Sequence, residues 1–145
     1  METLKLKYNL QEGDFSNAGN ASSDIKKTLK MLGIDAAIVK RMVVSIYEAE
    51  VNMIAHARGG KIEVFIDEEK VKAILTDVGP GIPDIDQAMQ VGYSTASDMV
   101  RQMGFGAGMG LPNIKKNSDE LYIESKLGEG TTVTIISNYL KKEEP

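Results

Sequence analysis

The chain has 145 residues, with 17 lysines and arginines against 21 aspartates and glutamates, so its formal net charge is −4. Hydrophobic residues make up 42% and charged residues 26% of the sequence, which is the ordinary composition of a globular domain. The length predicts one domain over residues 1–145 that forms a core without crosslinks. The absence of cysteine excludes disulfides, a thiolate nucleophile and cysteine-ligated metal sites.

Patterning argues against two further classes, membrane and nucleic-acid-binding proteins. No apolar run approaches the roughly 20 residues that span a bilayer, and the first residues lack the pattern of a signal peptide. We therefore expect a cytoplasmic protein with no membrane contact. The acidic balance and the scattered lysines offer no basic stripe for phosphate backbones, so direct binding of nucleic acid is not expected.

The N-terminal part of the chain predicts one strand followed by two helices. Residues 3–10 alternate between apolar and polar side chains, which is typical of a half-buried strand. Apolar residues recur at helical spacing from Ala18 to Leu32, and Gly33 follows as the expected C-terminal cap. Asp35 is expected to cap a longer, largely buried helix that runs to about Ala57.

The rest of the chain predicts a hairpin, a long loop, and a helix with two more strands. Alternation over residues 61–67 and 71–78, around a polar turn, predicts the hairpin. The stretch 79–110 holds seven glycines, so we expect a functional loop there, with a short helix beginning near Asp84. The last expected elements are one helix and two strands, at residues 111–117, 120–125 and 131–138.

The first candidate site residues lie in the second predicted helix. Glu48 and Asn52 are four residues apart and therefore share one helix face, beside Ser45, Ala49 and Ala55. One interpretation is a solvated helix edge, where both residue types are common. The other is that the pair faces a ligand cavity, in which the amide offers an oxygen to Mg²⁺ and the carboxylate accepts a proton.

Asp77 and the glycines after it form the second candidate. The sequence Asp77-Val78-Gly79-Pro80-Gly81 directly follows an apolar strand. Glycines at this place let the backbone turn and approach a planar ligand, from which the carboxylate would accept a hydrogen bond. The same pattern also occurs in plain turns, so this motif alone leaves both interpretations open.

The third candidate is the glycine-rich segment Gly104-Phe105-Gly106-Ala107-Gly108-Met109-Gly110-Leu111. Glycine at every second position lets successive N–H groups surround an anion, and the expected helix start adds its positive dipole end. A merely flexible loop is the alternative, and the regular spacing argues against it. The segment fits neither the dinucleotide fingerprint nor a Walker loop, and the protein-kinase motifs are absent. We therefore expect a phosphate site of another architecture.

In their order and spacing, these motifs resemble the GHKL ATP-binding superfamily of histidine kinase catalytic domains, gyrase, Hsp90 and MutL. The similar segments are Glu48 to Asn52 (N box), Asp77 to Gly81 (G1 box), Gly104 to Gly110 (G2 box) and Gly130-Thr131-Thr132 (the last Gly-Thr element). The resemblance covers about residues 3–138. Within the superfamily, the short form is similar to bacterial anti-sigma factor serine/threonine kinases and to the switch kinases of partner-switching modules. Glu50 departs from the serine- or threonine-like residue often found in their N box.

The resemblance implies both a fold and a set of residue roles. The fold would be an α/β two-layer sandwich, with a mixed, largely antiparallel sheet and helices on one face. Asp77 and Thr132 would bind adenine, Asn52 would coordinate Mg²⁺, and Glu48 would be the general base towards a serine or threonine hydroxyl. The other implied ATP-binding residues are Gly79, Gly81, Gly104, Gly106, Gly108, Gly110 and Lys115.

The implied function is an Mg²⁺/ATP-dependent protein serine/threonine kinase whose substrate is a STAS-domain protein of the anti-anti-sigma type. A sigma factor or a phosphatase regulator is a further implied partner, and the resemblance leaves a homodimer open. One alternative is an ATP-gated module that binds a sigma factor or regulator without essential catalysis. Another is a histidine kinase catalytic domain that acts on a histidine of another chain, because the lone His56 lies inside the N-box helix.

Overall fold

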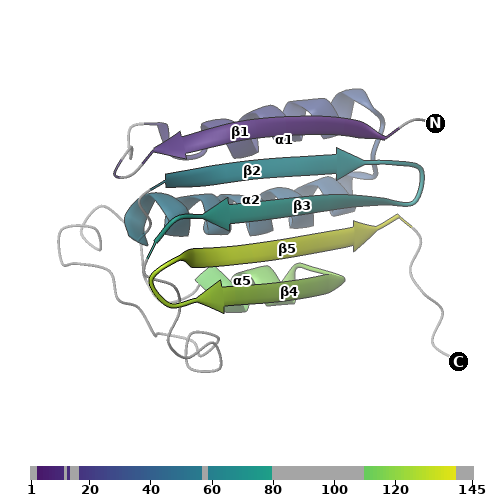
Figure 1. The fold of residues 1–145 in the computed structure, drawn as a ribbon. Coiled ribbons are helices and arrows are strands. Elements are labelled where there is room, and N and C mark those ends of the chain that lie inside the picture. Colours follow the sequence, from purple (N-terminus) through teal and green to yellow (C-terminus); the bar gives the residue numbers. More distant parts are fainter. Residues whose placement is uncertain (1–2, 12, 14–16, 57–58, 80–109, 140–145) are drawn as a thin grey trace, which may run out of the picture.

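The computed structural model describes residues 3–11, 13, 17–56, 59–79 and 110–139. Its strands are β1 (Leu4–Gln11), β2 (Gly59–Ile66), β3 (Lys70–Asp77), β4 (Glu120–Lys126) and β5 (Gly130–Asn138). Its helices are α1 (Asn20–Met31), α2 (Ala36–His56) and α5 (Gly110–Lys116). The strands form one layer and the three helices cover one face of it (Figure 1). The predicted two-layer sandwich is confirmed.

The five strands form one sheet in the order β1-β2-β3-β5-β4. All four strand pairings are antiparallel, so the predicted largely antiparallel sheet is confirmed and the described strands contain no parallel pair that would make it mixed. Because β5 lies between β3 and β4, the end of β3 is adjacent to the start of β5. This strand order determines which residues can meet where β3 ends and β5 begins.

Alternation along the strands produces the core between the two layers. Ile62, Val64 and Ile66 on β2 are fully buried, whereas the residues between them face the side that carries no helix. The helices contribute Ile25, Met42 and other apolar residues to the same cluster. The sheet therefore has one covered face and one open face, as antiparallel sheets commonly do.

The ends of the two long helices confirm the predicted caps. Asp35 Oδ1 accepts a 2.9 Å hydrogen bond from the Ala37 N–H at the first turn of α2. Gly33 adopts a φ of +75° just after α1, where a left-handed residue closes the helix. The observed bounds differ from the expected ones by one or two residues, and the largest difference is the start of α1 at Asn20 rather than near Ala18.

The N-terminus of α1 is capped by a side chain from α2. Glu50 is fully buried, and its carboxylate accepts hydrogen bonds from the Gly19 N–H at 3.1 Å, the Ser22 N–H at 3.2 Å and Ser22 Oγ at 2.6 Å. These contacts satisfy main-chain donors that the first turn of a helix cannot pair internally. These hydrogen bonds give a structural reason for the glutamate at position 50, where the related N boxes often have a serine- or threonine-like residue.

Several expected features lie outside the described residues, namely the helix near Asp84 and most of the loop at 79–110. Among the helices that the structure describes, none is long and apolar enough to cross a membrane. The remaining predicted elements, the hairpin at 61–78, the helix after residue 110 and the last two strands, are confirmed within one or two residues.

Candidate functional site

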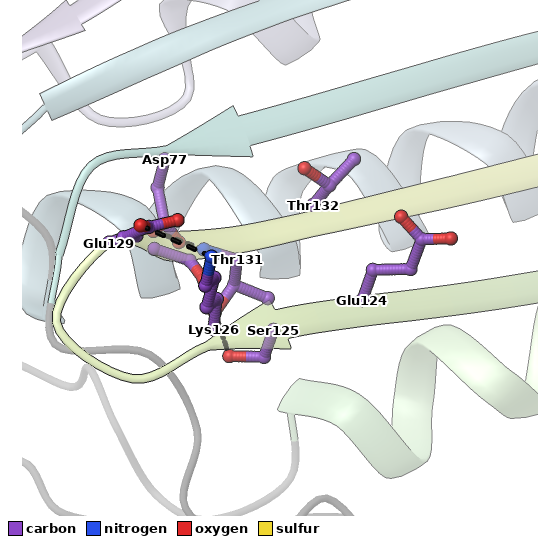
Figure 2. Close-up of a pocket in the computed structure, with 8 residues that line it drawn as sticks. Asp77, Glu124, Ser125, Lys126, Glu129, Thr131 and Thr132 are labelled. Carbon is purple, nitrogen blue, oxygen red and sulfur yellow. Dashed lines mark hydrogen bonds and ion pairs between the residues drawn. The ribbon is translucent and has the colours of Figure 1, made fainter.

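Asp77 is the last residue of β3, and its half-buried carboxylate turns towards the start of β5 (Figure 2). Asp77 Oδ1 accepts a 2.9 Å hydrogen bond from the main-chain N–H of Thr131. Burial raises the pKa of Asp77 above its ordinary value, and the hydrogen bond from Thr131 opposes this in part. The carboxylate is thus held in place on one oxygen, Oδ1, and among the described residues no donor contacts Oδ2.

Two glycines let the backbone close around Asp77. Gly130 has a φ of +145°, and a Cβ at this position would collide with the main-chain carbonyl of Asp77. The Gly79 N–H donates to the Glu129 carbonyl at 3.2 Å, which attaches the segment after β3 to the β4–β5 hairpin. Only residues without a side chain permit this close approach at position 130.

A hollow of about 300 Å³ opens beside Asp77 at the β4–β5 hairpin (Figure 2). Its lining is mostly polar and consists of Asp77, Glu124, Ser125, Lys126, Glu129, Gly130, Thr131 and Thr132. This volume is at the lower end of the range for small-molecule sites. Asp77 and Thr131 therefore border space that could accept part of a ligand.

Strand alternation separates the two threonines of the Gly-Thr-Thr sequence. Thr131 is buried on the helix-facing side, where Asp77 also lies, and its Oγ1 is 2.9 Å from Ser125 Oγ. Thr132 is the register partner of Thr76 and faces the open side of the sheet. The structure thus gives the contact with Asp77 to the main chain of Thr131, and the expected role of Thr132 in adenine binding stays a prediction.

One face of α2 carries a row of polar residues at spacings of four, three and four: Arg41, Ser45, Glu48 and Asn52. Ser45 is fully buried and its hydroxyl donates to the Arg41 carbonyl at 3.0 Å, so it stays within the helix. Glu48 and Asn52 are half-buried. The row is therefore not the fully solvated edge that the first interpretation described.

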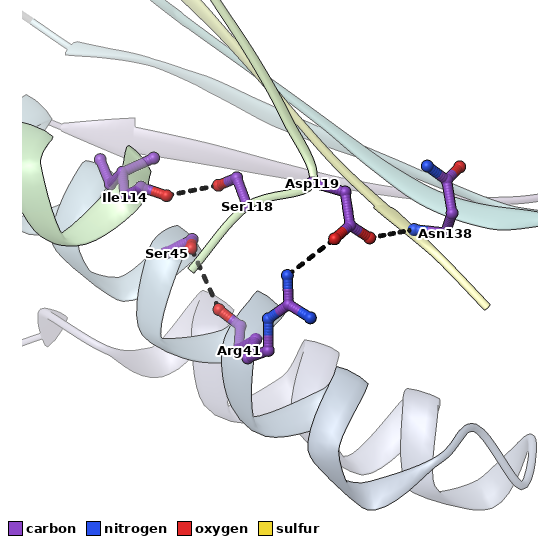
Figure 3. Close-up of polar contacts among 6 residues, drawn as sticks. All are labelled: Arg41, Ser45, Ile114, Ser118, Asp119 and Asn138. Carbon is purple, nitrogen blue, oxygen red and sulfur yellow. Dashed lines mark hydrogen bonds and ion pairs between the residues drawn. The ribbon is translucent and has the colours of Figure 1, made fainter. Parts of the chain in front are cut away.

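Helix α5 packs along this polar row of α2. Asn113 Nδ2 on α5 lies 3.5 Å from Glu48 Oε1, and Arg41 Nη2 lies 2.8 Å from Asp119 Oδ1 in the segment after α5 (Figure 3). Asn52, by contrast, has no hydrogen-bond partner in the part of the chain that the structure describes.

The C-terminal half of α2 lies against the end of β3 through a glycine of β2. A Cβ on Gly60 would lie 2.5 Å from Met53 Cε and 2.9 Å from the Asp77 Cα. Met53 is the neighbour of Asn52, so the helix that carries Glu48 and Asn52 reaches the strand end that carries Asp77. Helix α2 lies behind β2 and β3 in Figure 1.

Residues 37–139 match the sequence profile of the histidine kinase-, DNA gyrase B-, and HSP90-like ATPase family. The chain belongs to this ATPase family. It is 34% identical over 131 residues to the serine/threonine-protein kinase RsbT of Bacillus subtilis, and the match covers 88% of this chain and 90% of the relative.

Other relatives of this ATPase domain are anti-sigma F factors. Identity is 32% over 102 residues to the protein of Geobacillus stearothermophilus, covering 66% of each chain. It is 35% over 101 residues to the protein of Geobacillus kaustophilus, covering 66% of this chain and 62% of the relative. A crystal structure of the RsbU and RsbW domains of a Mycobacterium tuberculosis protein shares the fold, with a TM-score of 0.60 at 17% identity, over 94% of this chain and 31% of that one.

In this ATPase domain, Glu48 and Asn52 lie on the helix that reaches the strand end of Asp77, and the structure adds a contact of Thr131 with Asp77 and of Asn113 with Glu48, of which Asn113 lies outside the quoted motifs. Of the other predicted residues, Gly79 is buried beside Asp77, Gly110 begins α5, and Lys115 is exposed on α5. Gly81, Gly104, Gly106 and Gly108 lie outside the described residues. The described residues contain no cluster of three acidic or histidine side chains that could bind a metal ion by themselves.

Proposed function

We propose that this ATPase domain is an Mg²⁺/ATP-dependent protein serine/threonine kinase that phosphorylates a STAS-domain protein in a partner-switching module. The observation that carries the proposal is the half-buried Glu48, one helical turn before Asn52, on the helix that reaches the Asp77 strand end. The match to the kinase RsbT over most of both chains supports it. A sigma factor or a phosphatase regulator would be a further partner.

Asp77 and Thr131 would recognise the base of ATP. The adenine amino group is a donor, and the Asp77 carboxylate is an acceptor whose Oδ1 is already held by the Thr131 N–H at 2.9 Å. The Thr132 side chain points to the open face of the sheet but borders the same hollow as Asp77, so its hydroxyl is kept as a further proposed contact of the base. Main-chain N–H groups of the glycine-rich segments and the Lys115 side chain would bind the phosphates. The glycines proposed for this role are Gly79, Gly81, Gly104, Gly106, Gly108 and Gly110.

Asn52 is the residue proposed to hold Mg²⁺. Its carboxamide has no hydrogen-bond partner among the described residues, and one protein oxygen is enough for Mg²⁺, which takes its other ligands from water and phosphates. The lack of an acidic cluster in the described part of the chain agrees with a metal that arrives with its nucleotide. When bound, Mg²⁺ would neutralise charge on the phosphates of ATP.

Glu48 would act as the general base of the transfer. Its carboxylate would accept the proton of a serine or threonine hydroxyl on the partner protein. The hydroxyl oxygen then forms a bond to the γ-phosphorus, the bond from that phosphorus to the bridging oxygen breaks, and ADP leaves. The half-buried position of Glu48 removes part of its water shell while leaving one side open to an acceptor.

Incubation with γ-labelled ATP, Mg²⁺ and a panel of STAS-domain proteins from the same organism tests the proposal. Wild type should label one of them on serine or threonine, as identified by mass spectrometry. Glu48→Gln should lower the rate at least about 100-fold while ATP affinity changes little, because a base acts on the transfer step. Glu69→Gln, at an exposed turn, is the matched control and should retain full activity. Intact ATP binding with no transfer to any partner would overturn the kinase assignment.

A second candidate function is nucleotide-gated capture of a sigma factor or regulator, which the anti-sigma F factor relatives favour. The Glu48→Gln variant distinguishes the two. If the variant captures its partner with ATP and still supports signalling in cells, then binding is the function and catalysis is not essential. If capture persists and signalling fails, phosphate transfer is the function.

A further inference from the structure

The only described hydrogen bond to the Glu48 carboxylate comes from another helix. Asn113 on α5 places Nδ2 3.5 Å from Glu48 Oε1, and both side chains are half-buried. A carboxylate can only accept, so the amide nitrogen rather than the amide oxygen must face it. The distance is long for a hydrogen bond, as is common at sites without a substrate, where such contacts shorten when the complex forms.

The α5 helix that carries Asn113 is fixed in place from both sides of this residue. Ile114, the next residue, is fully buried in the core. The Asn113 carbonyl accepts from Asn117 Nδ2 at 2.8 Å and from the Asn117 N–H at 3.1 Å, which closes the last turn. Beyond the helix, Asp119 is attached to Arg41 on the same face of α2 as Glu48 (Figure 3). The helix that presents the Asn113 amide to Glu48 is therefore anchored to the core and to α2.

We propose that Asn113 is a positioning residue that orients the Glu48 carboxylate for proton abstraction; the inference rests on the proposed function. By donating to Oε1, Asn113 leaves Oε2 for the acceptor hydroxyl. A lysine or arginine at this position would neutralise the charge of the carboxylate. A neutral amide can orient the carboxylate and leave its negative charge unpaired. Misplacement of a reacting group by about 1 Å can cost roughly 100-fold in rate, so such a support has a measurable effect.

Kinetics of position 113 variants test this role against a purely structural one. Asn113→Leu keeps the size of the side chain but removes the donor. We expect kcat for the phosphorylation of the STAS-domain substrate to fall about 10- to 100-fold, with KM for ATP within twofold of wild type. Asn113→Gln keeps a donor and should recover part of the loss. In the Glu48→Gln background, Asn113→Leu should cause no further loss, because its effect passes through the base. An equal loss in both backgrounds would overturn the inference, as would full activity of Asn113→Leu.

A measurement on the unreacted protein separates this inference from the proposed function. The side-chain amide signals of Asn113 in a ¹⁵N spectrum should move when Glu48 is replaced by alanine, and should stay in place for the control Glu69→Gln. If these signals do not move while wild type transfers phosphate, the inference fails and the proposed function stands. If they move but wild type transfers no phosphate to any partner, the kinase assignment fails, and the role of Asn113 in catalysis fails with it.

Discussion

The main-chain N–H of Thr131 donates a 2.9 Å hydrogen bond to the Asp77 carboxylate, which joins the start of β5 to the last residue of β3. Because the donor is a backbone N–H, the contact depends on the path of the strand and not on the threonine side chain. That path depends in turn on Gly130, whose φ is +145°. The position of the proposed adenine-binding carboxylate thus depends on a glycine at the start of the neighbouring strand.

Replacing Gly130 by alanine should therefore weaken both folding and nucleotide binding. The new Cβ would collide with the Asp77 carbonyl, so β5 must move away from β3. We expect a loss of unfolding free energy of at least about 1 kcal/mol, as for alanine at other positive-φ positions, with a lower affinity for ATP. Urea unfolding and calorimetric titration with ATP measure the two effects.

Gly128→Ala is the matched control for Gly130→Ala. Gly128 also has a positive φ, +79°, but a Cβ there would meet nothing within 4 Å. The Gly128 variant should lose less stability than Gly130→Ala, because it adds backbone strain without a collision, and its affinity for ATP should remain that of wild type. Equal loss of ATP affinity in the two variants would show that the approach of Gly130 to Asp77 does not position the carboxylate.

The raised pKa of Asp77 predicts a pH dependence of stability with a definite sign. An acid whose pKa is higher in the folded state than its ordinary value of 3.8 binds its proton more tightly when folded. Its contribution to stability is therefore complete below that value and is lost as the pH rises through the folded-state pKa. Asp77→Asn, which keeps an oxygen for the Thr131 N–H, removes this titration.

Urea unfolding of wild type and Asp77→Asn over a series of pH values measures the effect. The unfolding free energy of wild type minus that of the variant should decrease as the pH rises from below 3.8 towards neutrality. An increase over the same interval would mean that hydrogen bonding to the charged form outweighs burial at Asp77. The difference between the proteins is used because it cancels the titration of the other carboxylates.

Local patterns predicted the elements well, because each strand and helix leaves its own period in the sequence. Alternation at residues 61–67 and caps at Asp35 and Gly33 required no knowledge of distant residues. Asn113 and Glu48 are 65 positions apart and Glu50 and Ser22 are 28 positions apart, and no local period encodes such pairs. The contact of the Thr131 N–H with Asp77 likewise joins residues 54 positions apart.

The Glu50 cap predicts an effect on stability that should be independent of the ATP site. In Glu50→Gln the amide group cannot accept from both Gly19 and Ser22, so at least one buried main-chain donor loses its partner. We expect a loss of about 1–3 kcal/mol in unfolding free energy. Chemical unfolding measures it, with exposed Glu69→Gln as the control. A Glu50→Gln protein as stable as wild type would show that water replaces the cap at the start of α1.

The Arg41–Asp119 pair predicts an unequal effect of removing its two members. Asp119 also accepts a 2.7 Å hydrogen bond from the Asn138 N–H, whereas the ion pair itself is about one-third exposed. An ion pair at this exposure contributes about 0.2–1 kcal/mol, and the hydrogen bond adds about 0.5–1.5 kcal/mol. Asp119→Ala should therefore destabilise more than Arg41→Met, which keeps the apolar stem.

A double-mutant cycle over the two positions isolates the ion pair. The coupling free energy should fall within the range of a partly exposed pair and decrease as the salt concentration rises, because ions screen exposed charges. The excess loss in Asp119→Ala should not depend on salt, since it arises from the donor at Asn138 that loses its partner. If Arg41→Met were the more destabilising variant, the attachment of α5 to α2 would depend on the guanidinium group and not on the Asp119 link to β5.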